Sequence, residues 1–251
     1  GEVPCRNLED VLGGFGRSFQ LLAERNISNA YVDENPLIVN VGLLTGSHAM
    51  TGMRSYFSGY SPIKGSKKGL PAAMWSAGSG KFGAKFKWTG LDELIFENRS
   101  EQPVYVVVRE SANGPVVTLK PAAHLLGLTT HEKIMLLQKE YDDAHFAVIG
   151  PAGEIWQNVY AGAVALSTEN QLKSKEDKCR FAGRGGMGSL MGYKNVIALV
   201  AQSKDKLGTT PEPVRKANLN VIKGGGSARL QPIKRGGGGG TWAAYDVLQA
   251  F

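Results

Sequence analysis

Two glycine-rich segments carry the residue types that can hold an anionic ligand against the main chain. The pattern G-x-G-x-x-G begins at Gly78 and occurs again from Gly183. Glycine lets the backbone approach a ligand closely, and a helix that begins after such a turn offers free N–H groups to a phosphate. One such pattern is weak evidence for a binding site, so its occurrence twice is what matters.

The two segments belong to longer stretches that resemble each other. Residues 78–95 and 183–200 align at a constant offset of 105, with the three glycines and one leucine (Leu94 and Leu199) identical. Upstream hydrophobic runs that meet glycine, at 37–46 and 147–153, repeat at nearly the same offset. We therefore predict an α+β fold made by tandem duplication of one unit, with layered sheets, flanking helices and a pseudo-twofold axis. The alternative is a glycine-rich packing turn that is duplicated for structural reasons alone.

Two anion-binding turns related by a twofold axis suit a ligand with two similar halves, each bearing a phosphate. A dinucleotide fits less well, because its site needs a βαβ unit with an acidic residue about twenty residues beyond the glycines. No local motif indicates a Ser/His/Asp triad. The four histidines share no metal-ligand spacing: His48, His124, His131 and His145.

The glycine turns must be positioned by helices and strands, which the hydrophobic pattern predicts. Helical spacing predicts a helix over 8–24, and Thr129 with Glu132 forms a capping box before a helix over 130–142. Strands are predicted at six ranges, two of them joined by an Asn-Gly turn: 37–42, 94–96, 104–108, 116–119, 146–150 and 196–201.

The composition is that of an ordinary globular protein. The chain has 251 residues, a net charge of +7 and two cysteines, Cys5 and Cys179. Two distant cysteines fit neither a disulfide framework nor a cysteine-based metal site, so we expect a reducing, cytoplasmic setting. No apolar run reaches the roughly 18 residues of a membrane span, and the polar start is no signal peptide, so we expect no membrane partner.

The charge is concentrated near the C-terminal end. Residues 204–251 carry +5 of the net charge and two glycine runs, at 224–226 and 236–240. A basic tail is usually a solvated segment, and we expect no nucleic-acid partner. We predict a duplicated cofactor-cradling domain over 1–203, then a basic glycine-rich linker or the start of a further helical domain over 204–251.

The second glycine segment and its surroundings resemble the aldehyde ferredoxin oxidoreductase family, in its N-terminal domain. The most specific motif is AGRGGMG at 182–188, followed by Met191-Gly192 and Lys194-Asn195. Supporting motifs follow in order between Leu12 and Ser203: LGG at 12–14, NPLI at 35–38, GLLTG at 42–46, SP at 61–62, FGAKFK at 82–87, PVYV at 103–106 and IGPAGE at 149–154.

The resemblance implies a tungsten (or molybdenum) bis-pyranopterin cofactor whose two phosphates are bridged by magnesium. By motif position, Arg54 corresponds to the arginine that lies between the pterin and an iron–sulfur cluster. The main-chain carbonyls near Ala77 and Ala182 would face the magnesium. Two segments would contact the pterins, and their residues are Ser76, Ala77, Gly78, Ser79 and Gly80 in the first and Phe181, Ala182, Gly183, Arg184 and Gly185 in the second.

The resemblance also implies an oxidoreductase that acts on aldehydes or related acyl substrates and passes electrons through a 4Fe-4S cluster to ferredoxin. In the family the cluster cysteines lie in helical domains that follow, and neither Cys5 nor Cys179 matches them. The expected partners are those domains or a separate subunit that carries the cluster, ferredoxin, and a second copy of the chain. The main alternative is a non-catalytic split or truncated homologue that binds pterin or docks on a partner subunit. A Gly/Arg-rich nucleic-acid binder ranks last because of the charge distribution.

Overall fold

The computed structural model describes residues 11–50 and 52–223, which fall into two compact units. The first unit comprises the chain up to Ser47 and from Gly52 to Lys206. The second comprises residues 48–51 and those from Leu207, and contains α7 (Glu212–Lys223). Inside this second unit, the Asn218 side chain bonds both Met50 N and the His48 carbonyl at 2.9 Å. The glycine runs predicted at 224–226 and 236–240 lie outside the described residues.

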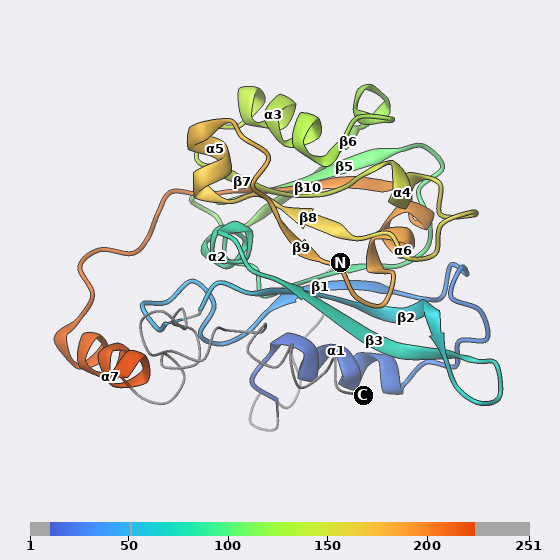
Figure 1. Ribbon diagram of the computed structural model, residues 1–251, viewed down its shortest axis with the longest axis horizontal. Helices are drawn as coiled ribbons and strands as arrows, with labels where there is room; N and C mark the ends of the chain where they lie inside the picture. The colour runs from blue at the N-terminus through green and yellow to red at the C-terminus, as the bar shows by residue number, and fades with distance from the viewer. Residues whose placement is uncertain (1–10, 51, 224–251) are drawn as a thin grey trace, which may run out of the picture. The chain divides into compact units, whose positions relative to one another are not determined.

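One sheet of the first unit has four antiparallel strands in the order β3-β2-β1-β4. Helix α1 (Gly14–Ala23) covers the face that is turned away from the other sheet, as Figure 1 shows. Strand β1 is buried along its whole length, because α1 packs on one face of it and α2 (Phe82–Trp88) and α6 (Met187–Tyr193) lie on the other. The strands are β1 (Leu37–Val41), β2 (Ser55–Gly65), β3 (Pro71–Gly78) and β4 (Glu93–Phe96).

The other sheet has six strands in the order β6-β5-β10-β7-β8-β9, and only β5 and β10 pair in parallel among the described pairs. Helix α3 (Thr130–Glu140) packs on β7, and α5 (Glu169–Ser174) lies beside it (Figure 1). The strands are β5 (Val104–Arg109), β6 (Val116–Pro121), β7 (Ala144–Ile149), β8 (Val164–Leu166), β9 (Arg180–Ala182) and β10 (Val196–Gln202). Two short helical turns, η1 (Ala123–Leu125) and α4 (Pro151–Glu154), lie in the connections.

Two short helices, α2 (Phe82–Trp88) and α6 (Met187–Tyr193), lie between the sheets (Figure 1). Each contacts strands of both sheets: α2 contacts mainly β7 and β10, and also β1, while α6 contacts β2, β10 and β7. Every residue of α6 is buried, and so are Phe82 and Phe86 of α2. Apolar side chains from both sheets and both helices form one hydrophobic core.

The elements of the two sheets follow one another in the same order along the chain. In one, β1, β2 and β3 are followed by α2 and β4, and the strand order is β3-β2-β1-β4. In the other, β7, β8 and β9 are followed, before β10, by α6, and the strand order is β9-β8-β7-β10. Equivalent residues also face each other, since Val39 pairs with Leu94 and Ala147 with Leu199. The mixed α+β fold with two sheets is therefore confirmed, while the tandem duplication stays a prediction.

The secondary-structure predictions are confirmed where local signals are strong. Helix α3 begins at the predicted capping box, with both of its reciprocal hydrogen bonds present. All six predicted strands exist. The helix predicted over 8–24 begins too early, because Gly13 has φ 82° and ψ −162°, which no α-helix can include, and α1 starts at Gly14. Strands β2, β3, β8 and β9 were not predicted. Of the helices described here, none has both the length and the apolar character to cross a membrane.

Candidate functional site

The terminal strands of the two sheets, β3 and β9, lie against each other. Gly78, the last residue of β3, makes this approach possible: a Cβ there would lie 2.1 Å from Leu166 Cδ1 and 3.4 Å from Ala182 N. A terminal strand leaves the N–H and C=O groups of one edge unpaired by its own sheet. The contact between β3 and β9, here called the seam, therefore offers main-chain polar groups from two strands at one place.

A first glycine loop, residues 79–81, leads from β3 into α2. Gly80 has φ 125°, and a Cβ at this position would lie 2.8 Å from the Ser167 carbonyl oxygen. Gly83 in α2 packs on the backbone of residues 53–54, where a Cβ would meet Met53 O at 3.0 Å and Arg54 O at 3.1 Å. These glycines are thus required by contacts within the protein.

A second glycine loop, residues 183–186, leads from β9 into α6. Gly185 and Gly186 have φ values of 67° and 70°, in the left-handed region that favours glycine. A Cβ on Gly186 would lie 2.2 Å from Tyr160 O, and one on Gly188 would lie 2.4 Å from Ala163 O. Gly183 differs, because no atom lies within 4 Å of the position that its Cβ would take. The space beside Gly183 is therefore open, while the other glycines of this motif serve packing.

The second loop is hydrogen-bonded to the hairpin of β2 and β3. Ser76 Oγ accepts from Arg184 N at 2.9 Å, and Ser61 Oγ donates to the Gly185 carbonyl at 2.7 Å. Both serines are buried. Ser61 was named in the sequence only as part of a supporting motif, and nothing local marks it as a partner of a loop 124 residues away.

The structure brings the two predicted cofactor segments, 76–80 and 181–185, together at the seam. Within them Ala182 is buried, Phe181 is 55% exposed and Arg184 is exposed. Arg54 is exposed too, in the loop before β2, where its carbonyl accepts from Thr45 Oγ1 at 3.1 Å. Its backbone lies against α2 through Gly83, next to the first loop.

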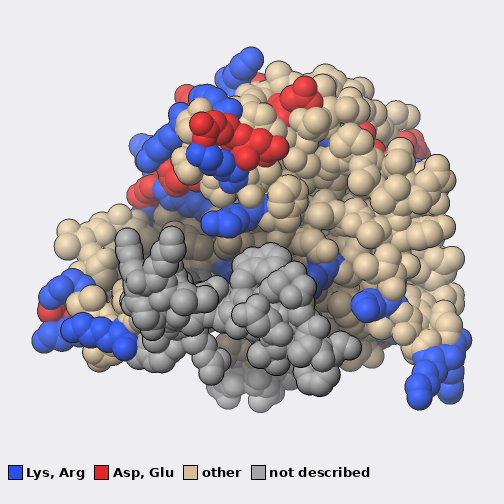
Figure 2. Space-filling view, in the orientation of Figure 1, with Lys and Arg blue, Asp and Glu red and all other residues tan. Residues whose placement is uncertain are grey.

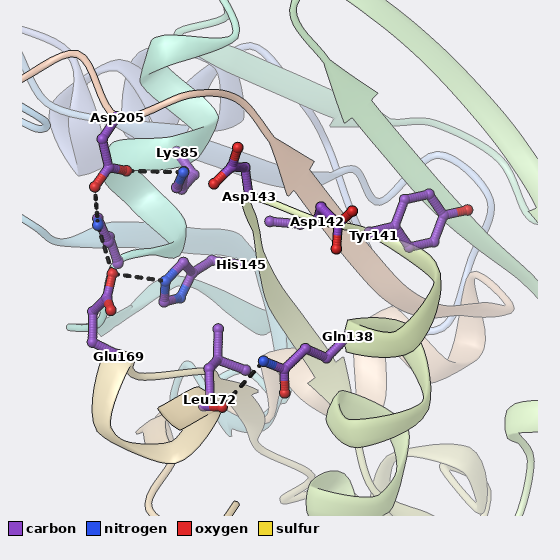
Figure 3. Close-up of a pocket in the computed structure, with 11 residues that line it drawn as sticks. Lys85, Gln138, Tyr141, Asp142, Asp143, His145, Glu169, Leu172 and Asp205 are labelled. Carbon is purple, nitrogen blue, oxygen red and sulfur yellow. Dashed lines mark hydrogen bonds and ion pairs between the residues drawn. The ribbon is translucent and has the colours of Figure 1, made fainter. Parts of the chain in front are cut away.

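A network of charged side chains follows the first loop. Lys81 bonds Glu169 and Asp205, and Lys85 lies 2.9 Å from Asp205, beside a cavity of about 200 Å³ (Figure 3). Burial alone would lower the pKa of Lys81, but its bonds to Asp205 and Glu169 raise it above the usual value. The sequence did not indicate this cluster, because its members come from four separate elements.

The buried His145 lies next to Glu169 of this network. Its Nδ1 lies 2.9 Å from Ser167 Oγ. Its Nε2 lies 3.7 Å from Glu169, as Figure 3 shows. Burial lowers its pKa to about 4, so the ring is neutral at pH 7. Among residues 11–50 and 52–223, no three His, Cys, Asp or Glu side chains are placed to share a metal ion.

Cys179 and Glu154 are held by contacts within the protein. Burial, together with Asp177, raises the pKa of Cys179 to about 11, so its thiol stays protonated at neutral pH. Glu154 pairs with the fully buried ammonium group of Lys133 and accepts from Gly127 N. Cys5 lies outside the described residues.

The charged surface is mixed in sign on the face shown in Figure 2. Lys, Arg, Asp and Glu side chains gather together over α3 and α5, and a purely basic group marks the tip of the β2–β3 hairpin. Exposed lysines at 64, 67 and 68 belong to that tip. Interleaved charges of both signs are typical of a solvated surface.

The fold and site define an α+β domain in which two glycine loops meet at the contact of two sheets. The family model described as "Aldehyde ferredoxin oxidoreductase, N-terminal domain" matches residues 1–203, and the chain belongs to this family. A tungsten-containing aldehyde ferredoxin oxidoreductase of Pyrococcus horikoshii is 32% identical over 224 residues, which are 85% of this chain and 33% of that protein. The corresponding protein of Pyrococcus furiosus is 31% identical over 77% of this chain and 30% of its own length.

A solved structure is also similar. It is the active site complex BamBC of benzoyl coenzyme A reductase with 1,5-dienoyl-CoA, with a TM-score of 0.67 and 26% identity. The match covers 94% of this chain and 32% of that one. The chain thus spans about a third of the length of the relatives that it matches.

Proposed function

We propose that this chain holds and orients a tungsten (or molybdenum) bis-pyranopterin within an oxidoreductase acting on aldehydes or related acyl substrates. The observation that carries the proposal is the meeting of two glycine loops at the seam, with open space beside Gly183. The unpaired edges of β3 and β9 suit a ligand that is bound through main-chain groups, and the exposed Arg54 and Arg184 supply positive charge for an anionic ligand. The residues therefore fit the cofactor that the family implies.

In this proposal the segments 76–80 and 181–185 bind one pterin half each. The carbonyls of Ala77 and Ala182 would help to hold the cofactor's magnesium, and the Arg54 guanidinium would lie on the side of the iron–sulfur cluster. When bound, the metal centre supplies the redox chemistry. The protein's part is to orient the cofactor and to exclude water beneath it by means of a closely packed glycine-rich base. The matching strand orders, β3-β2-β1-β4 and β9-β8-β7-β10, further support descent of the two halves from one duplicated unit.

The rest of the enzyme must come from elsewhere, because the chain spans a third of its relatives' length. We propose that helical domains like those of the relatives, in the same polypeptide or as a separate subunit, bring the 4Fe-4S cluster and the substrate pocket. Electrons would pass from them to ferredoxin, and a homodimer is a further expectation.

The test is the cofactor content of the chain, purified with any co-purifying partner from cells grown with tungstate. We expect tungsten, magnesium and oxidised pterin fluorescence in constant ratio. The variants Arg54→Ala and Arg184→Ala, both at exposed side chains, should lower the pterin content while far-UV circular dichroism stays the same. Lys67→Ala, another exposed basic residue on the hairpin tip, is the control and should keep the full content. Absence of tungsten, molybdenum and pterin from the chain and its complexes would contradict the proposal.

The alternative is a non-catalytic module that binds pterin or docks on a partner. The two hypotheses separate when the purified complex is assayed with an aldehyde and a redox dye. If the complex reduces the dye, and variants that lose pterin also lose this activity, the oxidoreductase is supported. A complex that contains pterin but reduces no dye with any aldehyde supports the module.

A further inference from the structure

The second glycine loop has a shape that it cannot keep by local forces alone. Gly185 and Gly186 are consecutive residues with left-handed φ values, as in a type I′ turn, but no backbone hydrogen bond between residues 183–187 closes this turn. Such a turn gains little from its own hydrogen bonds and depends on contacts with other parts of the chain. The hydrogen bonds to its main-chain groups therefore show which residues hold the loop in this shape.

Two main-chain groups of this loop are bonded by hydroxyls from the other sheet. Ser76 Oγ accepts from Arg184 N at 2.9 Å, and Ser61 Oγ donates to Gly185 O at 2.7 Å. Each serine is only 1% exposed, so water does not compete well for either bond. We call these two residues the serine clamp.

The direction of the Ser61 bond is determined by its neighbours. Its oxygen also accepts from Ile63 N at 3.2 Å and from Lys64 N at 3.0 Å. A hydroxyl has one proton and two acceptor lone pairs, so two incoming N–H groups direct that proton to Gly185 O. The start of the hairpin thus orients Ser61, and Ser61 orients the loop.

We propose that Ser61 and Ser76 are positioning residues, which hold the second glycine loop in its ligand-binding shape before the cofactor arrives. The Ser76 hydroxyl acts through the Arg184 amide in this proposal, whereas the main chain of residues 76–80 and the main chain around Gly183 contact the pterin. A loop that is ordered in advance does not lose conformational entropy on binding, and this raises affinity. The naming of the ligand rests on the proposed function, but the clamping of the loop does not.

The first test measures amide hydrogen–deuterium exchange of a peptide covering residues 183–187 in the purified chain. Loss of one buried hydrogen bond should speed this exchange about tenfold in Ser76→Ala and in Ser61→Ala. Ser58→Ala is a matched control: Ser58 lies on the same strand as Ser61, is fully buried, and its hydroxyl has no hydrogen-bond partner among the described residues. It should leave the loop unchanged.

A second pair of variants separates positioning from a general loss of packing. Ser61→Thr and Ser76→Thr keep the hydroxyl and should restore slow exchange, while a urea titration checks that each protein is folded. Equal exchange in the wild type and both alanine variants would overturn the clamp. Equal acceleration in Ser58→Ala would do so too, since burial alone would then explain the effect.

The second test measures tungsten and pterin per chain after expression with tungstate. Ser61→Ala and Ser76→Ala should carry at least about fivefold less of both than the wild type and Ser58→Ala, and the threonine variants should recover. Faster loop exchange with undiminished cofactor content would overturn the positioning role. A wild type without tungsten, molybdenum and pterin would instead contradict the proposed function, and the exchange experiment would still decide whether the clamp exists.

Discussion

The two glycine loops follow the same order of strand, turn and helix, yet different forces hold them. The first loop packs on the backbone of Ser167 through Gly80, and its Lys81 enters a network of ion pairs with Glu169 and Asp205. The second loop is hydrogen-bonded to Ser61 and Ser76, which carry no charge. Similar turns can therefore respond differently to acid, salt and substitution, because their surroundings differ.

The largest expected effect concerns the glycines of the second loop, which divide into packing and ligand-facing positions. Gly186→Ala would place a Cβ 2.2 Å from Tyr160 O at a residue with φ 70°. Backbone strain and the clash together should lower the free energy of unfolding by at least about 3 kcal/mol. Urea unfolding followed by circular dichroism measures this loss.

Gly183→Ala is the matched comparison, because its Cβ would project into open space. Its stability should stay within about 0.5 kcal/mol of the wild type. Tungsten content should nevertheless fall, since the new methyl group occupies the space that is proposed for the ligand. Equal destabilisation by the two substitutions would show that Gly183 is a packing glycine like its neighbours.

Acid should weaken the surroundings of the first loop through His145. The pKa of His145 is about 4 in the folded chain and about 6.5 when it is unfolded, so the unfolded state binds more protons between these values. Stability therefore falls as the pH is lowered from about 6.5 to about 4, by about 3 kcal/mol in total. Unfolding midpoints in urea across this range measure the slope.

His145→Gln should remove most of that slope, while His124→Gln, at an exposed position, should keep it. Amide hydrogen exchange compares the effect of acid on the two loops. A peptide covering 79–85 should exchange faster at pH 5 than at pH 7 after correction for the intrinsic rate, and one covering 183–187 should change less. Parallel acceleration of both peptides would mean that acid acts on the whole unit.

The smallest expected effect is that of salt. The carboxylates that bond Lys81 are partly exposed, with Glu169 at 45% and Asp205 at 51%. Raising the salt concentration to about 1 M should screen these pairs and speed exchange of the 79–85 peptide by no more than about fivefold. The bonds of the serine clamp are buried and uncharged, so the 183–187 peptide should be insensitive. A salt response of equal size in both peptides would contradict the claim that ion pairs hold the first loop and uncharged hydrogen bonds hold the second.

Much of the fold could be predicted from the sequence, because its signals are local. The capping box at Thr129 specifies where α3 begins, and the apolar runs of β1, β7 and β10 are long enough to be recognised as buried strands. Strand β3 has no such signal. Its residues, PAAMWSAG, alternate weakly and include small side chains of low strand propensity, so pairing with β2 determines its conformation.

The site was predictable only as two segments that belong together. The glycine pattern and the family resemblance named residues 76–80 and 181–185, and the structure places them side by side. The role of each glycine could not be predicted, because it depends on atoms remote in sequence, such as Tyr160 O at Gly186 and Ser167 O at Gly80. Ser61 was missed as a loop contact for the same reason.

The placement of α2 and α6 has a consequence for how such a protein could arise. Helix α2 follows a strand of one sheet but packs mainly on β7 and β10 of the other. Helix α6 packs on α4 and on strands of both sheets, with its Leu190 against Gly59 of β2. A half that ends at β4 would leave uncovered the face of α2 that packs on β7 and β10. Under the proposed duplication, an ancestor of half the length would have covered that face only as a pair of copies, and fusion of two genes would have made the pairing permanent.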